Sequence, residues 1–356
     1  VTFAEFMEAA LYLPGKGYYT SAEKRWGERG DYITNCDVSP IFARMLAKAV
    51  CEMWLFLGSP REFHLVEAGA GRGLLTEGIL AAIDGLYPRL SGCLKVSLVE
   101  KNPMLRKPPG ERTAWYEDIS GLKGPFTGCV YSQELLDSLP FHRVVMREDG
   151  LKEVYVGYGD GRFFDAEGRV STERLPEYFN DLGITLENGQ GCEVGLLAKQ
   201  WVRTAGGLLD RGFVVTVDYG MPARSLYRAG RAGTLVCHFR HTINDDPYRM
   251  VGMQDITCHV DFTAIRDGGF MAGLTPTGFT TQRNFLIGMG ILEELKEVHD
   301  PAVKDYETIR HNQGIKELVM PGGIGDAMKV FIQHKGVGGK EPKLRGFSFR
   351  DMKEGL

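Results

Sequence analysis

Three alternating glycines follow an acidic residue in the stretch HLVEAGAGRGLLTEG, residues 64–78. The acid is Glu67 and the glycines are Gly69, Gly71 and Gly73, so the spacing is E-x-G-x-G-x-G. A glycine turn between an apolar run and a helix-like stretch lets the backbone come close to a ligand. The stretch therefore indicates a binding site for a nucleotide-like molecule.

The position of the third glycine separates two classes of ligand. A dinucleotide site needs G-x-G-x-x-G, whose third glycine would fall at position 74, and this position is Leu74. The observed spacing is that of the first motif of class I S-adenosylmethionine-dependent methyltransferases. We therefore predict S-adenosyl-L-methionine as the cofactor and disfavour a dinucleotide oxidoreductase.

Acidic residues at the ends of the next two predicted strands agree with this cofactor. Glu100 ends KVSLVE, where a carboxylate can accept hydrogen bonds from both ribose hydroxyls. Asp118, followed by Ile119, ends the third strand, where methyltransferases commonly hold the adenine amino group. The alternative is a glycine-rich turn with solvated acids at the strand ends. The cofactor-binding residues that we predict from the motif are Glu67, Gly69, Gly71, Gly73, Glu100, Asp118 and Ile119.

Two acids after the fourth predicted strand have the chemistry that is needed if the acceptor is a guanidinium. A guanidinium is protonated and therefore a poor nucleophile, so carboxylates must hold it and take the proton that leaves. Glu134 and Asp137 are three residues apart, a spacing that places them on one face of a helical turn. They also follow the carboxyl edge of the sheet, where ligands bind. We predict Glu134 as the first and Asp137 as the second catalytic candidate. The alternative is that Glu134 stabilises a loop and Asp137 caps the next turn.

Asp218 and His259 are further catalytic candidates. Asp218 ends the fifth strand at the same edge, although a hydrogen bond to backbone is an equal alternative. His259 could act as a base or be a hydrogen-bonded structural residue. Tyr18, Tyr19 and Trp26 could surround a sulfonium or form a separate hydrophobic cluster under the N-terminal loop.

The order of elements predicts an α/β fold. From residue 63, short apolar strands alternate with helices, which is typical of a doubly wound, mostly parallel sheet. A capping box, Thr2 with Glu5, predicts a first helix, and Ser39-Pro40 and Gly58 bound a second. The predicted strands are 63–68, 95–100, 113–117, 128–133 and 213–219, with a last strand in AMKVFIQHK, a hairpin turning at Asp149-Gly150, and a helix in EVGLLAKQWVRTAGGLLDRG.

Most of the chain resembles the MidA-like methyltransferases of bacteria and mitochondria. The resemblance lies in FMEAALYLPGKGYY, RGDYIT, LVEAGAGRGLL, QELLDSLPFHRV, VDYG and QDITCHVDF. It implies a class I (Rossmann-like) core with a seven-stranded sheet and inserted elements that cover the active site. For the mitochondrial branch it also implies arginine methylation of a subunit during assembly of respiratory complex I. The loops that it places over the cofactor and acceptor carry Asp31, a further predicted cofactor ligand, and Gln254, Asp255, Thr257, His259 and Asp261.

We accordingly expect three regions. Residues 1–58 form a helical extension that covers the cofactor, and residues 59–335 form the methyltransferase core, with insertions at about 140–212 and 221–270. Residues 336–356 form a flexible basic tail.

Composition bounds the partners and the location. The 356 residues carry a net charge of −4, which argues against a general nucleic-acid binder. No apolar stretch approaches the roughly 20 residues that span a bilayer, so we expect neither membrane insertion nor a signal peptide. Seven scattered cysteines without a C-x-x-C pair predict reduced thiols and a cytoplasmic location. The Cys and His residues of CHFRH and of Cys258-His259 fit none of the usual zinc spacings, so we expect no metal.

Taken with the family resemblance, the sequence predicts a protein arginine N-methyltransferase that acts on a respiratory-complex-type or other protein subunit. A homodimer is compatible with the sequence. Two alternatives stay open: methylation of a small molecule, and an assembly factor that binds the cofactor but turns over little.

Overall fold

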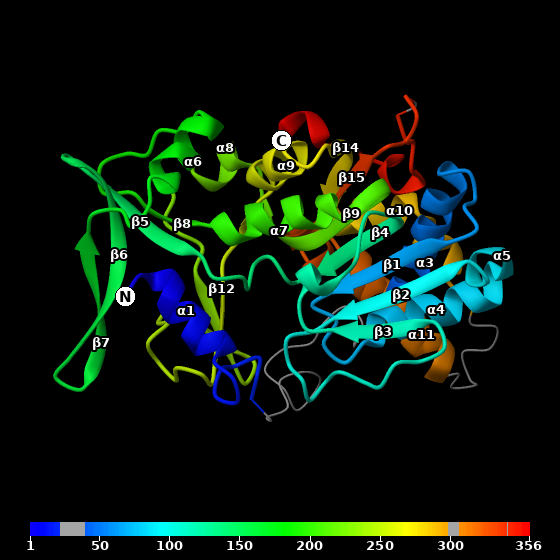
Figure 1. The fold of residues 1–356 in the computed structure, drawn as a ribbon, viewed down its shortest axis with the longest axis horizontal. Coiled ribbons are helices and arrows are strands. Elements are labelled where there is room, and N and C mark those ends of the chain that lie inside the picture. Colours follow the sequence, from blue (N-terminus) through cyan, green and yellow to red (C-terminus); the bar gives the residue numbers. More distant parts are fainter. Residues whose placement is uncertain (22–39, 298–305, 340) are drawn as a thin grey trace.

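Seven strands form one central sheet in the order β14-β15-β9-β4-β1-β2-β3 (Figure 1). The computed structural model describes residues 1–21, 40–297, 306–339 and 341–356. The strands are β1 (Phe63–Ala68), β2 (Leu94–Val99), β3 (Thr113–Tyr116), β4 (Phe126–Gln133), β9 (Leu209–Met221), β14 (Thr275–Thr281) and β15 (Met328–Lys335). β15 is antiparallel to both of its neighbours, whereas β3, β2, β1, β4 and β9 are parallel. The predicted mostly parallel α/β fold is confirmed, and a two-residue strand β13 (Val260–Asp261) also pairs with β9.

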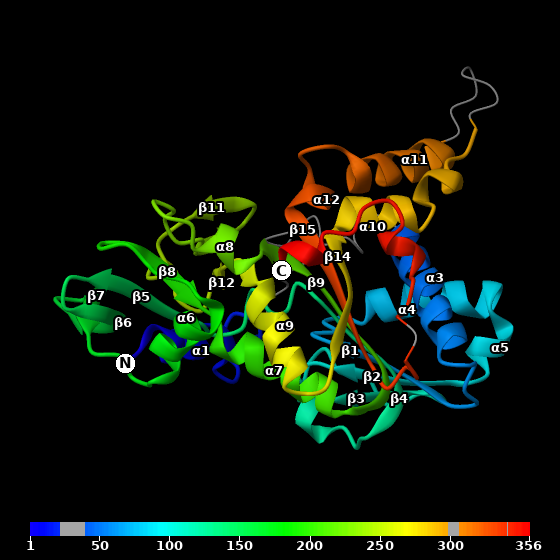
Figure 2. The ribbon, with the colours of Figure 1, turned by 90° about the horizontal axis from the view of Figure 1, so that it is seen from above.

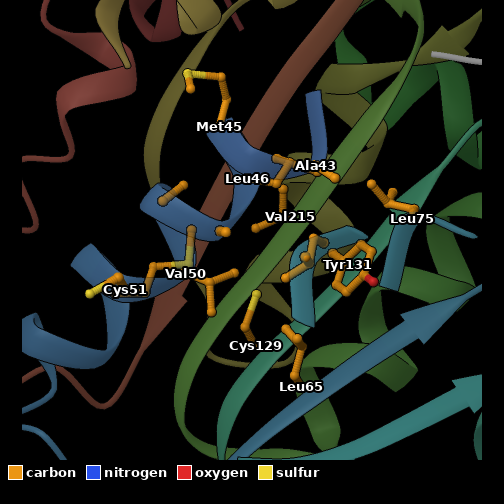
Figure 3. Packing of buried hydrophobic residues seen from close by; sticks show 14 of the residues in the cluster. Ala43, Met45, Leu46, Val50, Cys51, Leu65, Leu75, Cys129, Tyr131 and Val215 are labelled. Atoms are coloured by element: carbon orange, nitrogen blue, oxygen red, sulfur yellow. The ribbon is translucent and has the colours of Figure 1, made fainter. Parts of the chain in front are cut away.

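The sheet is buried on both faces because its strands are apolar at successive positions. The register aligns Leu65 with Cys129 and Val66 with Val130, and alternate residues point to opposite faces. Leu65 and Cys129 pack beneath helix α3 (Pro40–Phe56), which contributes Met45, Leu46 and Val50 to that side (Figure 3). The same layer contains α4 (Leu74–Leu86), α5 (Pro88–Ser91), α10 (Gln282–Gly288) and α11 (Tyr306–Val319).

Two helices cover the opposite face of the sheet. These are α7 (Leu196–Gly207) and α9 (Phe262–Phe270), which Figure 2 shows from above. Val66 and Val130 pack against residues of both helices. α7 is shorter than the helix predicted for 193–212. Residues 191–194 form strand β8, and the apolar residues after Gly207 enter β9.

A second sheet lies beside the core, in the order β7-β6-β5-β8 (Figure 1). Its strands are β5 (His142–Arg147), β6 (Gly150–Gly159), β7 (Arg162–Gly168) and β8 (Gly191–Val194), so the predicted turn at Asp149-Gly150 is confirmed. α6 (Arg174–Leu182), α8 (Ala223–Leu226) and a three-stranded sheet of β10 (Val236–Phe239), β11 (Thr242–Asn244) and β12 (Asp255–Thr257) complete this side.

Helix α1 (Phe3–Tyr12) lies between the second sheet and the carboxyl edge of the central sheet (Figure 1). Its predicted capping box is present, because the Thr2 hydroxyl accepts from the Glu5 N–H and the Glu5 side chain accepts from the Thr2 N–H. α1 is therefore placed to form a wall of any site at that edge.

The C-terminal segment packs against the core rather than extending as the flexible tail that we predicted. Leu344 is buried, and the Met352 N–H donates to the Phe279 carbonyl. The short helices η3 (Arg345–Phe347) and η4 (Lys353–Gly355) and the connecting elements η1 (Ile119–Gly121), η2 (Ile291–Glu294) and α12 (Ile324–Ala327) complete the described part of the chain.

Candidate functional site

A cavity of about 500 Å³ opens at the carboxyl edge of β1, β2, β3 and β4. This is the edge at which open α/β sheets bind ligands, and the volume suits a small-molecule cofactor. Its walls come from the glycine turn, the ends of these strands, α1 and α7. Of the predicted site residues, Glu67, Gly69, Gly71, Glu100, Asp118, Ile119 and Glu134 line it.

The glycine turn leaves open space where a ligand would approach. Gly69 and Gly71 have φ angles of +73° and +52°, which side-chain-bearing residues rarely adopt. A Cβ at Gly71 would meet nothing within 4 Å, and Gly71 lines the cavity. Gly73 differs, because a Cβ there would lie 3.1 Å from Leu98 and Trp115, so it serves close packing. The turn therefore fits an S-adenosylmethionine molecule lying against its backbone.

Glu67 is anchored inside the protein, below the glycine turn. Its carboxylate accepts from the Thr76 N–H at 3.2 Å and from the Thr76 hydroxyl, which itself lies 2.6 Å from the Tyr131 hydroxyl. Burial raises the pKa of Glu67 to about 7, and these hydrogen bonds oppose the rise. Glu67 therefore fixes the turn to α4 and β4 as well as lining the cavity.

We expect the Glu67→Gln variant to show how stability depends on this pKa. A raised folded-state pKa means that the folded protein holds a proton which the unfolded chain releases, so stability falls as pH rises from about 4.5 to about 7. Glutamine does not titrate. The free energy of unfolding of the variant minus that of the wild type should therefore increase by about 3 kcal/mol over this range. Urea unfolding at a series of pH values measures it.

Glu173→Gln is the control for this measurement. Glu173 is exposed and directly precedes helix α6. Its difference from the wild type should change far less across the same pH values. If the difference between Glu67→Gln and the wild type also stays constant across these pH values, the pKa of Glu67 is not raised.

Glu100 clamps the glycine turn from the end of β2. Its Oε2 accepts from the Gly71 N–H and its Oε1 from the Asn102 N–H, both at 2.8 Å. Burial raises the pKa of Glu100. A carboxylate has about four acceptor positions, so two remain for hydroxyl groups of a ligand.

Asp118 and Ile119 form the far end of the cavity. Asp118 caps η1, its carboxylate accepting from the Ser120 N–H at 2.8 Å, and it is exposed toward the opening. Ile119 is buried and offers an apolar surface beside it. This pairing suits a flat base with an exocyclic amino group.

Glu134 lies at the cavity wall in a left-handed backbone conformation, with φ of +50°. Such a conformation costs a non-glycine residue of order 1–3 kcal/mol and is concentrated at functional sites. The Glu134 N–H donates to the Val217 carbonyl, and Gln133 Nε2 donates to the Glu134 carboxylate at 3.1 Å. The expected helical turn through Glu134 and Asp137 is wrong, because this left-handed residue breaks it; Glu134 lines the cavity, whereas Asp137 is buried and does not.

Asp218 holds the Glu134 loop from behind. Its Oδ2 accepts from the Leu135 and Leu136 N–H groups at 3.2 and 2.9 Å, and its Oδ1 from the Tyr219 N–H at 2.8 Å. Asp218 is fully buried and does not line the cavity. Burial raises its pKa to about 7, and Glu134 contributes to the rise.

Asp137 and His259 also lie behind the cavity wall. Burial and the neighbouring Asp218 and Asp255 raise the pKa of Asp137 well above its ordinary range. His259 borders a separate small cavity of about 20 Å³, and burial and Arg231 lower its pKa. Within the described residues, the Nδ1 atom of His259 has no hydrogen-bond partner.

Of the other predicted residues, some line the cavity, some lie in the core and some lie outside the residues that the structure describes. Tyr19 lines the cavity, whereas Tyr18 is fully buried in a cluster with Phe3 and Met7. Asp31 and Trp26 lie outside the described residues.

Two helices contribute cavity-lining residues that were not predicted individually from the sequence. α7 presents Leu197, Gln200, Trp201 and Thr204, a spacing of one helical face. α1 presents Glu8 and Tyr12. The periodicity of both helices was visible in the sequence, but nothing in it indicated which face would meet the glycine turn.

The sequence matches a family model over residues 45–280. That family is described as "Putative S-adenosyl-L-methionine-dependent methyltransferase". The chain belongs to this family of S-adenosylmethionine-dependent methyltransferases, the MidA-like family. A crystal structure from Burkholderia thailandensis, bound to S-adenosylhomocysteine, is 31% identical and has a TM-score of 0.88. The match covers 100% of this chain and 92% of the chain in that crystal structure.

Curated relatives extend the comparison. Proteins named "Protein arginine methyltransferase NDUFAF7, mitochondrial" from Mus musculus and Homo sapiens are 27% and 28% identical to this methyltransferase. The matches cover 93% of this chain and 80% and 79% of the relatives. The prediction of a cytoplasmic location is contradicted by these relatives, because their names place them in mitochondria.

Two further findings concern metals and membranes. Among residues 1–21, 40–297, 306–339 and 341–356, no three His, Cys, Asp or Glu side chains are grouped as metal ligands. Within the same ranges, no helix has the length and apolar character needed to cross a membrane.

Proposed function

We propose that this methyltransferase transfers a methyl group to an arginine side chain of a protein, with Glu134 as the residue that holds the guanidinium. The named activity of the curated relatives supports the choice of arginine. The observation that carries the proposal is the position of Glu134, a carboxylate on the cavity wall held in a strained backbone conformation.

The surroundings of Glu134 favour a cationic acceptor. Asp137 and Asp218 are buried nearby, and burial together with the charge of Glu134 raises the pKa of both, so Glu134 is the acid of this group that carries its charge at the cavity wall. A carboxylate on a wall of low dielectric creates a negative potential in the cavity. A positively charged guanidinium is stabilised there far more than a neutral small molecule would be.

The chemistry divides between cofactor and protein. Bound S-adenosylmethionine supplies an electrophilic methyl group on its sulfonium. Glu134 would accept hydrogen bonds from the guanidinium, draw its positive charge away from the reacting nitrogen and hold the proton that leaves. Asp218 would keep the Glu134 loop in place through Leu135 and Leu136, and Glu67, Glu100 and the glycine turn would orient the cofactor. Positioning of this kind accounts for much of the catalysis of a bimolecular transfer.

We expect label from methyl-labelled S-adenosylmethionine to enter a protein of the host lysate as methylarginine. Acid hydrolysis and chromatography of the labelled band identify the amino acid, and mass spectrometry identifies the protein. Subunits of respiratory complexes, which the family resemblance implies, are the first bands to compare.

Glu134→Gln and Glu173→Gln are assayed in parallel. The first should abolish the labelled band and the second should keep it. Label in methyllysine, or in a small molecule only, would reject arginine as the acceptor. Calorimetric binding of S-adenosylhomocysteine without any labelled product would favour an assembly factor with little turnover.

A further inference from the structure

The wall that α1 gives to the cavity contains the parts of a binding site for a planar cation. Glu8 and Tyr12 lie one helical turn apart and both line the cavity. Lys101, which follows Glu100, lines it as well. Its Nζ atom is 3.0 Å from the Glu8 carboxylate and 4.7 Å from the centre of the Tyr12 ring. A cation between a carboxylate and an aromatic face is the arrangement that recognises ammonium and guanidinium groups.

The aromatic part of this arrangement is held firmly. The Tyr12 hydroxyl donates to the Ser138 carbonyl at 3.1 Å, and the ring stacks on Tyr19 with centres 5.4 Å apart. The Tyr19 hydroxyl in turn donates to Asp255 Oδ1 at 2.7 Å. Ser138 belongs to the loop that begins with Glu134, so the Tyr12 ring is tied to the loop that carries the proposed acceptor-holding acid.

The cationic part is held loosely. The side chains of Lys101 and Glu8 are 46% and 50% exposed, and ion pairs this exposed contribute little to stability. Lys101 can therefore leave Glu8 and Tyr12 at small cost when a better cation arrives. A guanidinium is such a cation, because it is planar, stacks on aromatic rings, binds a carboxylate through two hydrogen bonds and is more weakly hydrated than an ammonium.

We propose that Glu8 and Tyr12 form an entry subsite at the rim of the cavity, which receives the guanidinium of the acceptor arginine before Glu134 holds it, and that Lys101 occupies this subsite until the acceptor displaces it. The inference rests on the proposed function, since it describes how the substrate of that site is received. It assigns Lys101 the role of an internal competitor and Glu8 the role of the carboxylate that selects arginine.

The test measures binding of a defined probe rather than turnover. N-acetyl-L-arginine N-methylamide is titrated by NMR into the protein saturated with S-adenosylhomocysteine, and the citrulline analogue, which keeps the shape but lacks the charge, is titrated in parallel. The variants are Lys101→Met and Glu8→Gln. Lys107→Met is the matched control, because Lys107 forms an equally exposed pair with Glu77 that does not line the cavity.

We expect Lys101→Met to bind the arginine probe about two- to fivefold more tightly than the wild type, the range that an exposed ion pair allows. Glu8→Gln should bind it about fivefold more weakly, and Lys107→Met should match the wild type. The citrulline probe should bind weakly to every protein and respond to neither cavity variant.

Three results would overturn the subsite. They are an arginine affinity that Lys101→Met leaves unchanged, no saturable binding of the arginine probe to any variant, and a loss of S-adenosylhomocysteine affinity in Lys101→Met. The last would place Lys101 against the cofactor. The proposed function fails separately, if the lysate assay yields no methylarginine while the probe still binds as expected.

Discussion

Replacing Glu134 by glutamine is expected to lower kcat for arginine methylation about 10²- to 10⁴-fold, the range of a positioned general acid–base group. Glutamine keeps the shape of the side chain and an oxygen that accepts hydrogen bonds. It lacks the negative charge that draws positive charge from the reacting nitrogen, and it cannot take the proton. The affinity for S-adenosylhomocysteine should stay nearly unchanged, because the glycine turn and Glu100 are untouched.

Steady-state kinetics on the acceptor protein found in the lysate, with calorimetry for S-adenosylhomocysteine, measures both quantities. Glu173→Gln is the control, since it makes the same chemical change at an exposed position away from the cavity. A Glu134→Gln enzyme with a raised KM and an unchanged kcat would make Glu134 a binding residue only. If both kcat and KM are unchanged, Glu134 takes part in neither catalysis nor acceptor binding.

The central sheet could be predicted from the sequence because its strands are buried on both faces. In Phe63–Ala68, every residue except the half-buried His64 is buried, so the strand reads as a short, mostly apolar stretch without the polar alternation of a half-exposed strand. The limits of α7 could not be predicted in the same way. β8 and the start of β9 flank it directly, and their apolar residues continue its pattern without a break.

The cofactor side of the cavity was predictable because its residues follow the ends of adjacent parallel strands. Glu67 is the penultimate residue of β1, and Glu100 and Asp118 follow the ends of β2 and β3. The carboxyl ends of parallel strands meet at one edge. Tyr12 and Trp201 reach the same cavity from helices far away in the sequence, and no local pattern encodes such a meeting. The spacing of Glu134 and Asp137 predicted a shared helical face, but the left-handed backbone at Glu134 prevents the helical turn, and of these two acids Glu134 alone lines the cavity.

Asp218→Ala is expected to lower kcat about 10²-fold by releasing the Glu134 loop, since a displacement of about 1 Å at a reacting group has an effect of this size. The buried carboxylate accepts the Leu135, Leu136 and Tyr219 N–H groups, and alanine leaves all three without that partner. The free energy of unfolding should fall by about 2–4 kcal/mol, because an unsatisfied buried donor costs about 1–3 kcal/mol.

Kinetic and pH measurements distinguish a positioning residue from one that is structural only. In the wild type, protonation of Asp218 below its pKa of about 7 removes an acceptor for the loop, so kcat should fall as pH decreases through 7. Asp218→Asn keeps one carbonyl oxygen and does not titrate. It should therefore show an intermediate kcat without that pH dependence, while S-adenosylhomocysteine binding stays close to that of the wild type. If folded Asp218→Ala is less stable yet retains the wild-type kcat and pH profile, Asp218 supports the fold but does not position Glu134.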